Sequence, residues 1–110
     1  MTGKVPQKGY LGIIANTVAI PEEIAQTAGL EQETGVMIFS VEPGSPARKA
    51  GLAMGDVLVK FNGKPVTEFY DLPRLLAQDV IDKETTLTII RKESLIETTI
   101  IPTIHGGEED

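Results

Sequence analysis

The sequence predicts a mainly β domain of the α+β class, in which five to six short strands form a small, partly open antiparallel barrel and two helices of unequal length close its ends. Two observations carry this prediction. Short apolar runs rich in β-branched residues recur along the chain, and glycine, proline and asparagine separate them. The 110 residues, of which 41% are hydrophobic, suffice for one core and therefore for one domain.

The first half of the chain is expected to alternate strands with short helices. Strands are predicted for residues 10–15 and 36–41, and helices for 21–29 and 46–50. The first helix has proline at its first position, two glutamates that complement its positive N-terminal end, and Gly29 where it stops. Ser45 is expected to cap the second helix. The strand at 36–41 is apolar enough to be covered on both faces.

The second half of the chain is expected to be richer in hairpins. Strands are predicted for residues 57–61, 64–66, 85–91 and 95–101. Asn62 and Gly63 form the sequence pair most typical of a two-residue hairpin turn, and Lys92 to Ser94 form a second turn. Pro65 places the short strand at an edge, because proline has no N–H group for a central ladder.

The longest helix is predicted for residues 68–79, with Thr67 as its N-cap. Its apolar face would comprise Phe69, Leu72, Leu75, Leu76 and Val80. Pro73 conflicts with this start, because proline is tolerated only in the first turn of a helix. The alternative is a helix that begins near Tyr70 or Asp71, with Asp71 as the N-cap.

Composition excludes several classes of function. The chain has no cysteine, which excludes disulfides and thiolate chemistry, and its net charge of −6 without a Lys/Arg cluster argues against nucleic-acid binding. No apolar run approaches the roughly 18 residues that span a bilayer, and the start of the chain does not resemble a targeting signal. We expect residues 1–8 to be a flexible lead-in or linker and residues 103–110 to be a disordered acidic tail.

Catalysis by this chain is not expected. The only histidine, His105, falls in the predicted tail, and no sequence pattern of a nucleophile elbow or phosphate-binding loop is present. Acidic pairs such as Glu22 and Glu23 suit a solvated surface better than a metal site. No cofactor and no metal are predicted.

The stretch from Gly9 to Ile14 has two interpretations. Its two glycines permit a tight turn into the first strand, and local sequence favours that simple interpretation. The same loop, with apolar side chains between glycines and a strand after it, also suits backbone binding of a peptide carboxylate.

A resemblance to a known family favours the second interpretation. The run from Gly44 to Val66 reads G-S-P-A, then A-G-L, then G-D, an apolar strand, and N-G-K-P-V. This pattern is similar to the centre of a PDZ domain. The order of the surrounding elements resembles the circularly permuted bacterial type, as in HtrA (Do-like, trypsin-fold) serine proteases. The resemblance covers about residues 8–102, and we assign residues 9–102 to this domain.

The resemblance implies a peptide-binding groove with three parts. The carboxylate-binding loop would comprise Tyr10, Leu11, Gly12 and Ile13. The strand that pairs with the peptide would comprise Ile14, Ala15 and Asn16. The hydrophobic pocket would comprise Leu72, Leu75 and Leu76. The alternative is that the three leucines belong only to the core. Lys8 is either a partner of the carboxylate or a solvated lysine, and Tyr10 either lines the pocket or packs beneath it.

The implied ligands are protein C-termini, or unfolded polypeptides, that end in an apolar residue. Such a module would recruit substrate to an attached serine protease, or regulate it, in the cell envelope or periplasm. The alternatives are an adaptor of a secretion or envelope-assembly protein and a domain of an intramembrane or C-terminal-processing protease.

Overall fold

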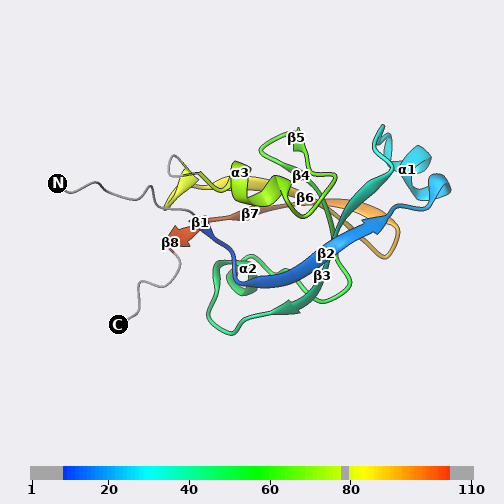
Figure 1. Ribbon diagram of the computed structural model, residues 1–110. Helices are drawn as coiled ribbons and strands as arrows, with labels where there is room; N and C mark the ends of the chain where they lie inside the picture. The colour runs from blue at the N-terminus through cyan, green and yellow to red at the C-terminus, as the bar shows by residue number, and fades with distance from the viewer. Residues whose placement is uncertain (1–8, 78–79, 105–110) are drawn as a thin grey trace.

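The computed structural model describes residues 9–77 and 80–104 (Figure 1). The predicted lead-in at residues 1–8 and most of the predicted tail lie outside this part of the chain. The elements are β1 (Gly9–Tyr10), β2 (Ile13–Ala19), α1 (Glu22–Ala28), β3 (Thr34–Val41), α2 (Pro46–Lys49), β4 (Val57–Phe61), β5 (Lys64–Pro65), α3 (Asp71–Leu75), β6 (Thr85–Arg91), β7 (Ser94–Ile100) and β8 (Thr103–Ile104).

Most of the strands belong to one antiparallel sheet. The strand order is β2-β3-β4-β6-β7, and β5 pairs with β4 beside this path, giving six strands; β1 and β8 form a separate two-stranded ribbon. The expected mainly β fold with short helices is therefore confirmed. The ribbon of β1 and β8 lies at one end of the molecule, and α1 lies at the other (Figure 1). As a result, β2 runs from the ribbon end towards α1.

Both predicted hairpin turns are present. Asn62 and Gly63 connect β4 to β5 with φ angles of 53° and 81°. Lys92 and Glu93 connect β6 to β7 with φ angles of 52° and 67°. Two consecutive residues with positive φ define the type I′ turn, whose twist matches that of the strands. The predicted caps are also confirmed, because Gly29 has φ 72° and Ser45 Oγ accepts from the Arg48 N–H group at 3.2 Å.

The prediction of a long helix at 68–79 is wrong. The structure has five helical residues, Asp71–Leu75, so that Pro73 falls within the first turn, as the alternative start required. Asp71 is the first helical residue and not the N-cap, which is Tyr70. The helix stops early because Leu76 has left the helical region, with φ −88° and ψ 48°.

The strand boundaries differ from the predictions at three places. The first predicted strand is divided, because Gly12 has φ 84° between β1 and β2, and β2 then continues to Ala19. The strand β3 is not covered on both faces throughout, because Phe39 is 46% exposed where the pairing with β2 is irregular. The predicted tail begins too early, since Thr103 and Ile104 pair with β1 as β8.

The core is formed mainly by the sheet, the loop before β2 and α3. Its fully or nearly buried members include Leu11, Val36, Ile38, Leu58, Phe61, Leu72, Leu76, Leu87, Ile89 and Ile100. A second cluster lies under α1 and comprises Ile20, Ala25, Val59 and Ile90. Leu11, Leu72 and Leu76 therefore connect the core directly with the loop and helix described next.

An ion pair with a buried carboxylate fixes the loop that precedes β4. Asp56 is 3% exposed and receives two hydrogen bonds from Arg91 of β6, from Nε at 2.9 Å and from Nη2 at 2.7 Å. The same carboxylate accepts from the Ala53 N–H group at 2.9 Å, and Arg91 also donates to the Gly51 carbonyl at 2.8 Å. The G-D pair of the sequence motif thus has a structural role.

Candidate functional site

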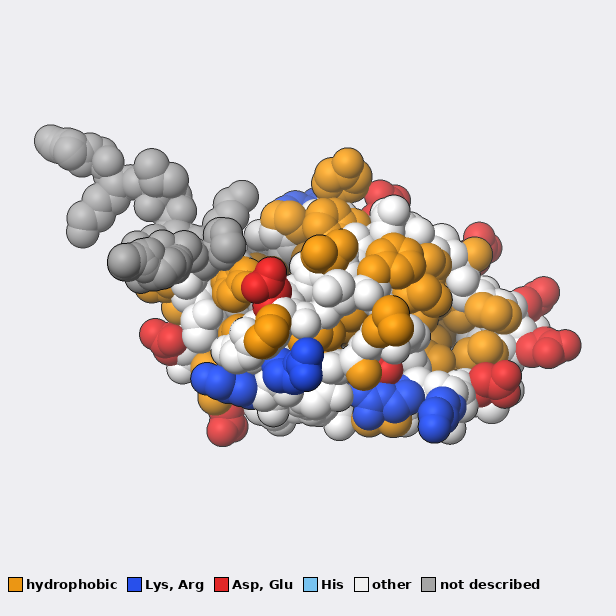
Figure 2. All heavy atoms as spheres, turned by 90° about the horizontal axis from the view of Figure 1, so that it is seen from below, with side chains coloured by type: hydrophobic (Ala, Val, Ile, Leu, Met, Phe, Trp, Pro, Cys, Tyr) orange, Lys and Arg blue, Asp and Glu red, His pale blue; other side chains and the backbone are white. Residues whose placement is uncertain are grey.

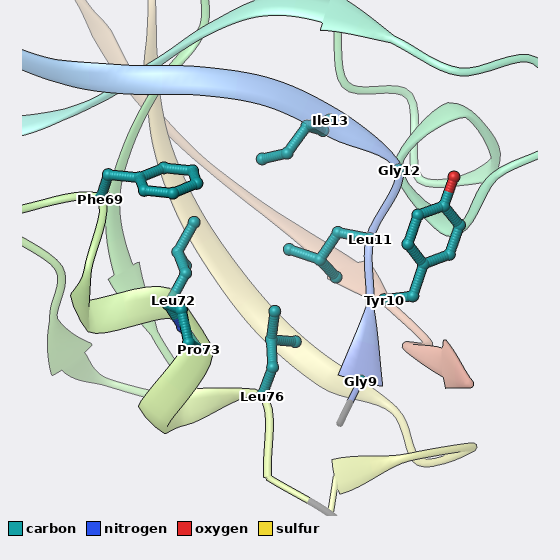
Figure 3. Close-up of a pocket in the computed structure, with 9 residues that line it drawn as sticks. All are labelled: Gly9, Tyr10, Leu11, Gly12, Ile13, Phe69, Leu72, Pro73 and Leu76. Carbon is teal, nitrogen blue, oxygen red and sulfur yellow. The ribbon is translucent and has the colours of Figure 1, made fainter. Parts of the chain in front are cut away.

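An open pocket of about 440 Å³ lies between the start of β2 and α3 (Figure 3). Its lining is largely apolar and comprises Gly9, Tyr10, Leu11, Gly12, Ile13, Phe69, Leu72, Pro73 and Leu76. Figure 3 shows Leu11, Leu72 and Leu76 pointing into the space between the loop and α3, with Ile13 and Phe69 at its far side. A pocket of this polarity can take an apolar side chain of a ligand, and its volume is ample for one.

The loop from Leu11 to Gly12 is held by hydrogen bonds to its carbonyl groups. The Leu11 carbonyl accepts from the Ala47 N–H group at 2.9 Å, and the Gly12 carbonyl accepts from the Glu42 N–H group at 2.8 Å. The carbonyls therefore point towards α2 and the turn before it. Successive peptide groups held in this way direct their N–H groups elsewhere, which is how a loop prepares donors for an anion.

Two backbone donors of this loop have no acceptor within the described part of the chain. Within residues 9–77 and 80–104, the N–H groups of Leu11 and Gly12 donate no hydrogen bond. Both residues line the pocket, and Leu11 is only 3% exposed. Unpaired N–H groups beside an apolar pocket have a strong tendency to bind an acceptor such as a carboxylate.

Glycine is required at position 12 for two reasons. Its φ of +84° is disfavoured for residues with a side chain, and a Cβ atom there would lie 2.2 Å from Ser45 Cβ. Position 9 is also confined, because a Cβ atom there would lie 3.2 Å from both Leu76 Cδ2 and Pro102 Cβ. The Gly9 N–H group donates to the Leu76 carbonyl at 2.8 Å, which ties the loop to the end of α3.

Tyr10 contributes to the pocket lining, but its ring lies on the other side of the loop from Leu72 and Leu76 (Figure 3). Its hydroxyl is close to Gly12, since a Cβ atom on that glycine would lie 3.2 Å from Tyr10 Oη. Tyr10 therefore packs on the side of the loop that faces away from α3, and it contributes little to the space beside the helix.

The strand β2 has an open edge, because β3 is its only strand neighbour within the described part of the chain. The bond from the Glu42 N–H group to the Gly12 carbonyl makes Ile13 and Val41 a non-hydrogen-bonded pair of the antiparallel ladder. The N–H and C=O groups of Ile13 therefore point to the open edge. Along a strand these directions alternate, so Ala15 presents its backbone to the open edge as well.

The predicted site residues fall into distinct places. Of the predicted pairing strand, Ala15 has its backbone at the open edge, whereas the alternation directs the backbone groups of Ile14 and Asn16 towards β3. Of the predicted pocket, Leu72 and Leu76 line it. Leu75 is half-buried, packs against the core and is not part of the lining. Lys8 and His105 lie outside the described residues.

Two pocket residues were not assigned to the site from the sequence. Phe69 precedes α3 and is 36% exposed, and Pro73 lies in the first turn of the helix. The sequence could have indicated Phe69, because it is an aromatic residue beside a possible helix start. It was interpreted as part of a longer apolar helix face, and the shorter helix changes that interpretation.

The loop before α3 is held in place by Asp71. Its Oδ2 atom accepts from the N–H groups of Thr67 at 2.9 Å and Glu68 at 3.1 Å, and its Oδ1 atom accepts from Arg74 Nη2 at 2.7 Å. The hydrogen bond from the Thr67 N–H group, followed by that from Glu68, lowers the pKa of the Asp71 carboxyl below its ordinary value of 3.8. The carboxylate form therefore stabilises the loop that carries Phe69.

The charges of the surface are unevenly distributed. Figure 2 shows acidic side chains gathered at the end of the molecule that carries α1, and basic side chains along one edge of the same face. The acidic end, with α1, comes after the last residue of β2. The loop that contains Leu11 and Gly12 comes before the first residue of β2. Because seven strand residues span about 23 Å, the acidic group lies far from the N–H groups of this loop.

Other kinds of site find no support in the described residues. Residues 9–77 and 80–104 contain no group of three or more His, Asp or Glu side chains placed to hold a metal ion. None of the helices in these residues has the length and apolar character needed to cross a membrane.

Comparison with known proteins agrees with this geometry. The family model described as PDZ domain matches residues 9–101. The chain therefore belongs to the PDZ domain family. It is 35% identical over 100 residues to the "Probable periplasmic serine endoprotease DegP-like" of Marinomonas sp. (strain MWYL1), covering 89% of this chain and 21% of that protein. A protein of the same name from Pseudomonas fulva (strain 12-X) is 34% identical over 93 residues, covering 84% and 19%.

Solved structures show the same fold. The HtrA-type protease AlgW with decapeptide has a TM-score of 0.69 at 20% identity, covering 90% of this chain and 30% of that one. The HtrA3 PDZ domain bound to a phage-derived ligand, FGRWV, has a TM-score of 0.66 at 23% identity, covering 94% and 95%. More particularly, the chain is related to the PDZ domains of HtrA/DegP-like serine proteases. It spans about a fifth of the length of the curated relatives that it matches.

Proposed function

We propose that this domain binds the C-terminus of a polypeptide as an added strand along β2. The observation that carries the proposal is the pair of unused N–H groups at Leu11 and Gly12, which lie where an apolar pocket meets the open edge of β2. The peptide would run antiparallel to β2, with its carboxylate on these N–H groups. The backbone groups of Ile13 and Ala15 would then pair with its main chain.

The last side chain of the ligand would enter the pocket above Leu11, Leu72 and Leu76. The largely apolar lining favours valine, leucine, phenylalanine, alanine or methionine at that position. Burying such a side chain contributes about 1.5–3 kcal/mol. Ordering a flexible peptide offsets much of the total, so we expect micromolar affinity, about −8 kcal/mol or weaker. The phage-derived ligand bound to the HtrA3 PDZ domain, FGRWV, ends in valine and agrees with this choice.

The proposal predicts that a free carboxylate is required. A short peptide ending in valine should bind, and its C-terminally amidated form should bind at least tenfold more weakly, because the amide loses the charge that the N–H groups stabilise. Titration followed by amide chemical shifts measures both affinities. Equal binding of the two forms, or shifts that avoid residues 11–15 and α3, would contradict the proposal.

A matched pair of variants tests the pocket. Phe69 lines it, whereas the next residue, Tyr70, is 76% exposed and does not. Phe69→Ala should weaken the valine peptide by roughly fivefold, which corresponds to about 1 kcal/mol. Tyr70→Phe, which keeps the edge-to-face contact between the Tyr70 and Phe69 rings, should leave the affinity within about twofold.

We further propose that the domain acts within a larger protein of the cell envelope or periplasm, as a non-catalytic module that delivers substrate to an attached HtrA-like serine protease or regulates it. The support is the relation to DegP-like proteases, of which this chain spans about a fifth. The coding sequence on either side of this segment tests the idea: a trypsin-like domain upstream is expected. Flanking membrane helices would instead favour an intramembrane protease. The absence of both a trypsin-like domain and membrane helices would favour an adaptor.

A further inference from the structure

The open edge of β2 ends abruptly at Thr17. Ile13, Ala15 and Thr17 alternate along the strand as the residues whose backbone points away from β3. The Thr17 N–H group, however, already donates to Asn16 Oδ1 at 2.9 Å. The third position at which a peptide strand would find a donor is therefore occupied by a neighbouring side chain.

A second bond at Thr17 closes the space beside the strand. Its hydroxyl oxygen, Oγ1, accepts from the Phe69 N–H group at 2.9 Å, across 52 residues of sequence. A peptide between β2 and α3 would have to pass between these two residues. A further strand would need about 4.8 Å between its own backbone and that of β2. The direct bond of 2.9 Å between Thr17 Oγ1 and the Phe69 N–H group leaves no room for a strand between the two residues.

The loop that supplies the Phe69 N–H group is anchored from two other sides. Asp71 Oδ2 accepts from the Thr67 N–H group at 2.9 Å, and Thr34 Oγ1 donates to the Thr67 carbonyl at 2.7 Å. The contact with Thr17 thus joins the edge strand to a fixed segment. Because the ring of Phe69 also lines the pocket, the same bond sets the position of one pocket wall.

We propose that Thr17 is a specificity-determining residue that limits the groove to the last four residues of a ligand. This inference rests on the proposed function. With the last residue opposite Ile13, the third-last lies opposite Ala15 and the fifth-last opposite Thr17. The fifth-last residue therefore meets the occupied donor and the closed gap, and residues beyond the fourth add little affinity.

A peptide length series tests this limit. Acetylated peptides of three, four and seven residues, all with the C-terminal sequence Ala-Val-Val and with alanine at every added position, are titrated by calorimetry against the whole chain. The affinity should change by less than twofold from three to four residues and again from four to seven, because no further backbone group of β2 is open beyond Ala15. A sevenmer that binds the wild type more than fivefold tighter than the tetramer overturns the inference.

The variants Thr17→Val and Thr17→Ser separate the hydroxyl from the shape of the side chain. Both variants are made in the Asn16→Ala background, which frees the Thr17 N–H group. Valine keeps the β-branch but removes the acceptor of the Phe69 bond, so the sevenmer should gain at least fivefold over the tetramer in this variant. Serine keeps the acceptor and should behave like the wild type. Identical length dependence in all three proteins overturns the inference while leaving the proposed function intact. If no peptide with a free carboxylate binds, both fail.

Discussion

The variant Gly12→Ala tests how the proposed carboxylate-binding loop is built. The added Cβ would lie 2.2 Å from Ser45 Cβ and 2.7 Å from Ser45 Oγ. Carbon atoms in contact lie about 3.5–4.0 Å apart, so the loop and the start of α2 must separate by more than 1 Å. The substitution also places a side chain at φ +84°.

The cost follows from these two effects. A side chain in the left-handed region costs about 1–2 kcal/mol. The required separation also stretches the bonds from the Ala47 N–H group to the Leu11 carbonyl, 2.9 Å, and from the Glu42 N–H group to the Gly12 carbonyl, 2.8 Å. At about 1 kcal/mol each, their loss brings the expected total to about 3–4 kcal/mol.

Two control variants separate the conformational cost of the left-handed residue from the cost of the contact with Ser45. Gly29→Ala has φ +72° but no atom within 4 Å of the added Cβ, so it should show the conformational cost alone, about 1–2 kcal/mol. Ser45→Gly removes the atoms that the new methyl group would meet, and glycine is tolerated at an N-cap at a cost of a few tenths of a kcal/mol. In the Ser45→Gly background, the cost of Gly12→Ala should therefore fall to the level seen at Gly29.

Urea denaturation measures the free energies of unfolding, and titration with the valine peptide measures the site. Gly12→Ala should lose peptide binding along with stability. If it costs no more than Gly29→Ala, or if Ser45→Gly does not reduce its cost by at least about 1 kcal/mol, the close approach of Gly12 to α2 is not what shapes the loop.

Two further predictions concern carboxylates that hold loops. Asp56→Ala leaves the guanidinium of Arg91 without its buried partner and should lower the free energy of unfolding, measured in urea, by about 2–3 kcal/mol. Arg74→Ala removes an exposed ion pair and should lower it by less than about 1 kcal/mol. Equal losses in the two variants would contradict the structural role of Asp56. The hydrogen-bonded Asp71 has a lowered pKa, so its contribution to stability is fully present above its ordinary value of 3.8 and is lost as the pH falls through the lower folded-state value. Asp71→Asn should therefore lose less stability than the wild type between pH 4 and pH 2 in thermal melts, and parallel curves would refute this.

Local signals were sufficient for the turns and several strands. Asn62 and Gly63 favour positive φ by themselves, and the strands at 57–61 and 85–91 were predicted with the bounds that the structure has. The ribbon of β1 and β8 could not be predicted in this way. Its two strands have two residues each and lie at opposite ends of the chain, so that only the closed fold brings them together.

The site was predictable only in part for a related reason. The resemblance implied the places of Leu72 and Leu76 beside the groove and of Gly12 in the loop, and the apolar pattern alone did not distinguish the two leucines from core residues. The length of α3 depended on one residue, Pro73, whose conflict with the longer pattern allowed two different helix starts. The apolar pattern alone favoured the longer helix, and it thereby placed Leu75 in the pocket and Phe69 on a helix face.

The far end of the groove depends on contacts that leave no pattern in the sequence. Threonine at position 17 is an ordinary strand residue, and nothing near it indicates that its hydroxyl accepts from a backbone group 52 residues away. Yet this bond determines where a peptide has to stop and where the Phe69 ring lies. In related domains with the same loop and pocket, a change at this strand position or in the loop before α3 is therefore expected to alter how much of a ligand is read, even when every pocket residue is retained.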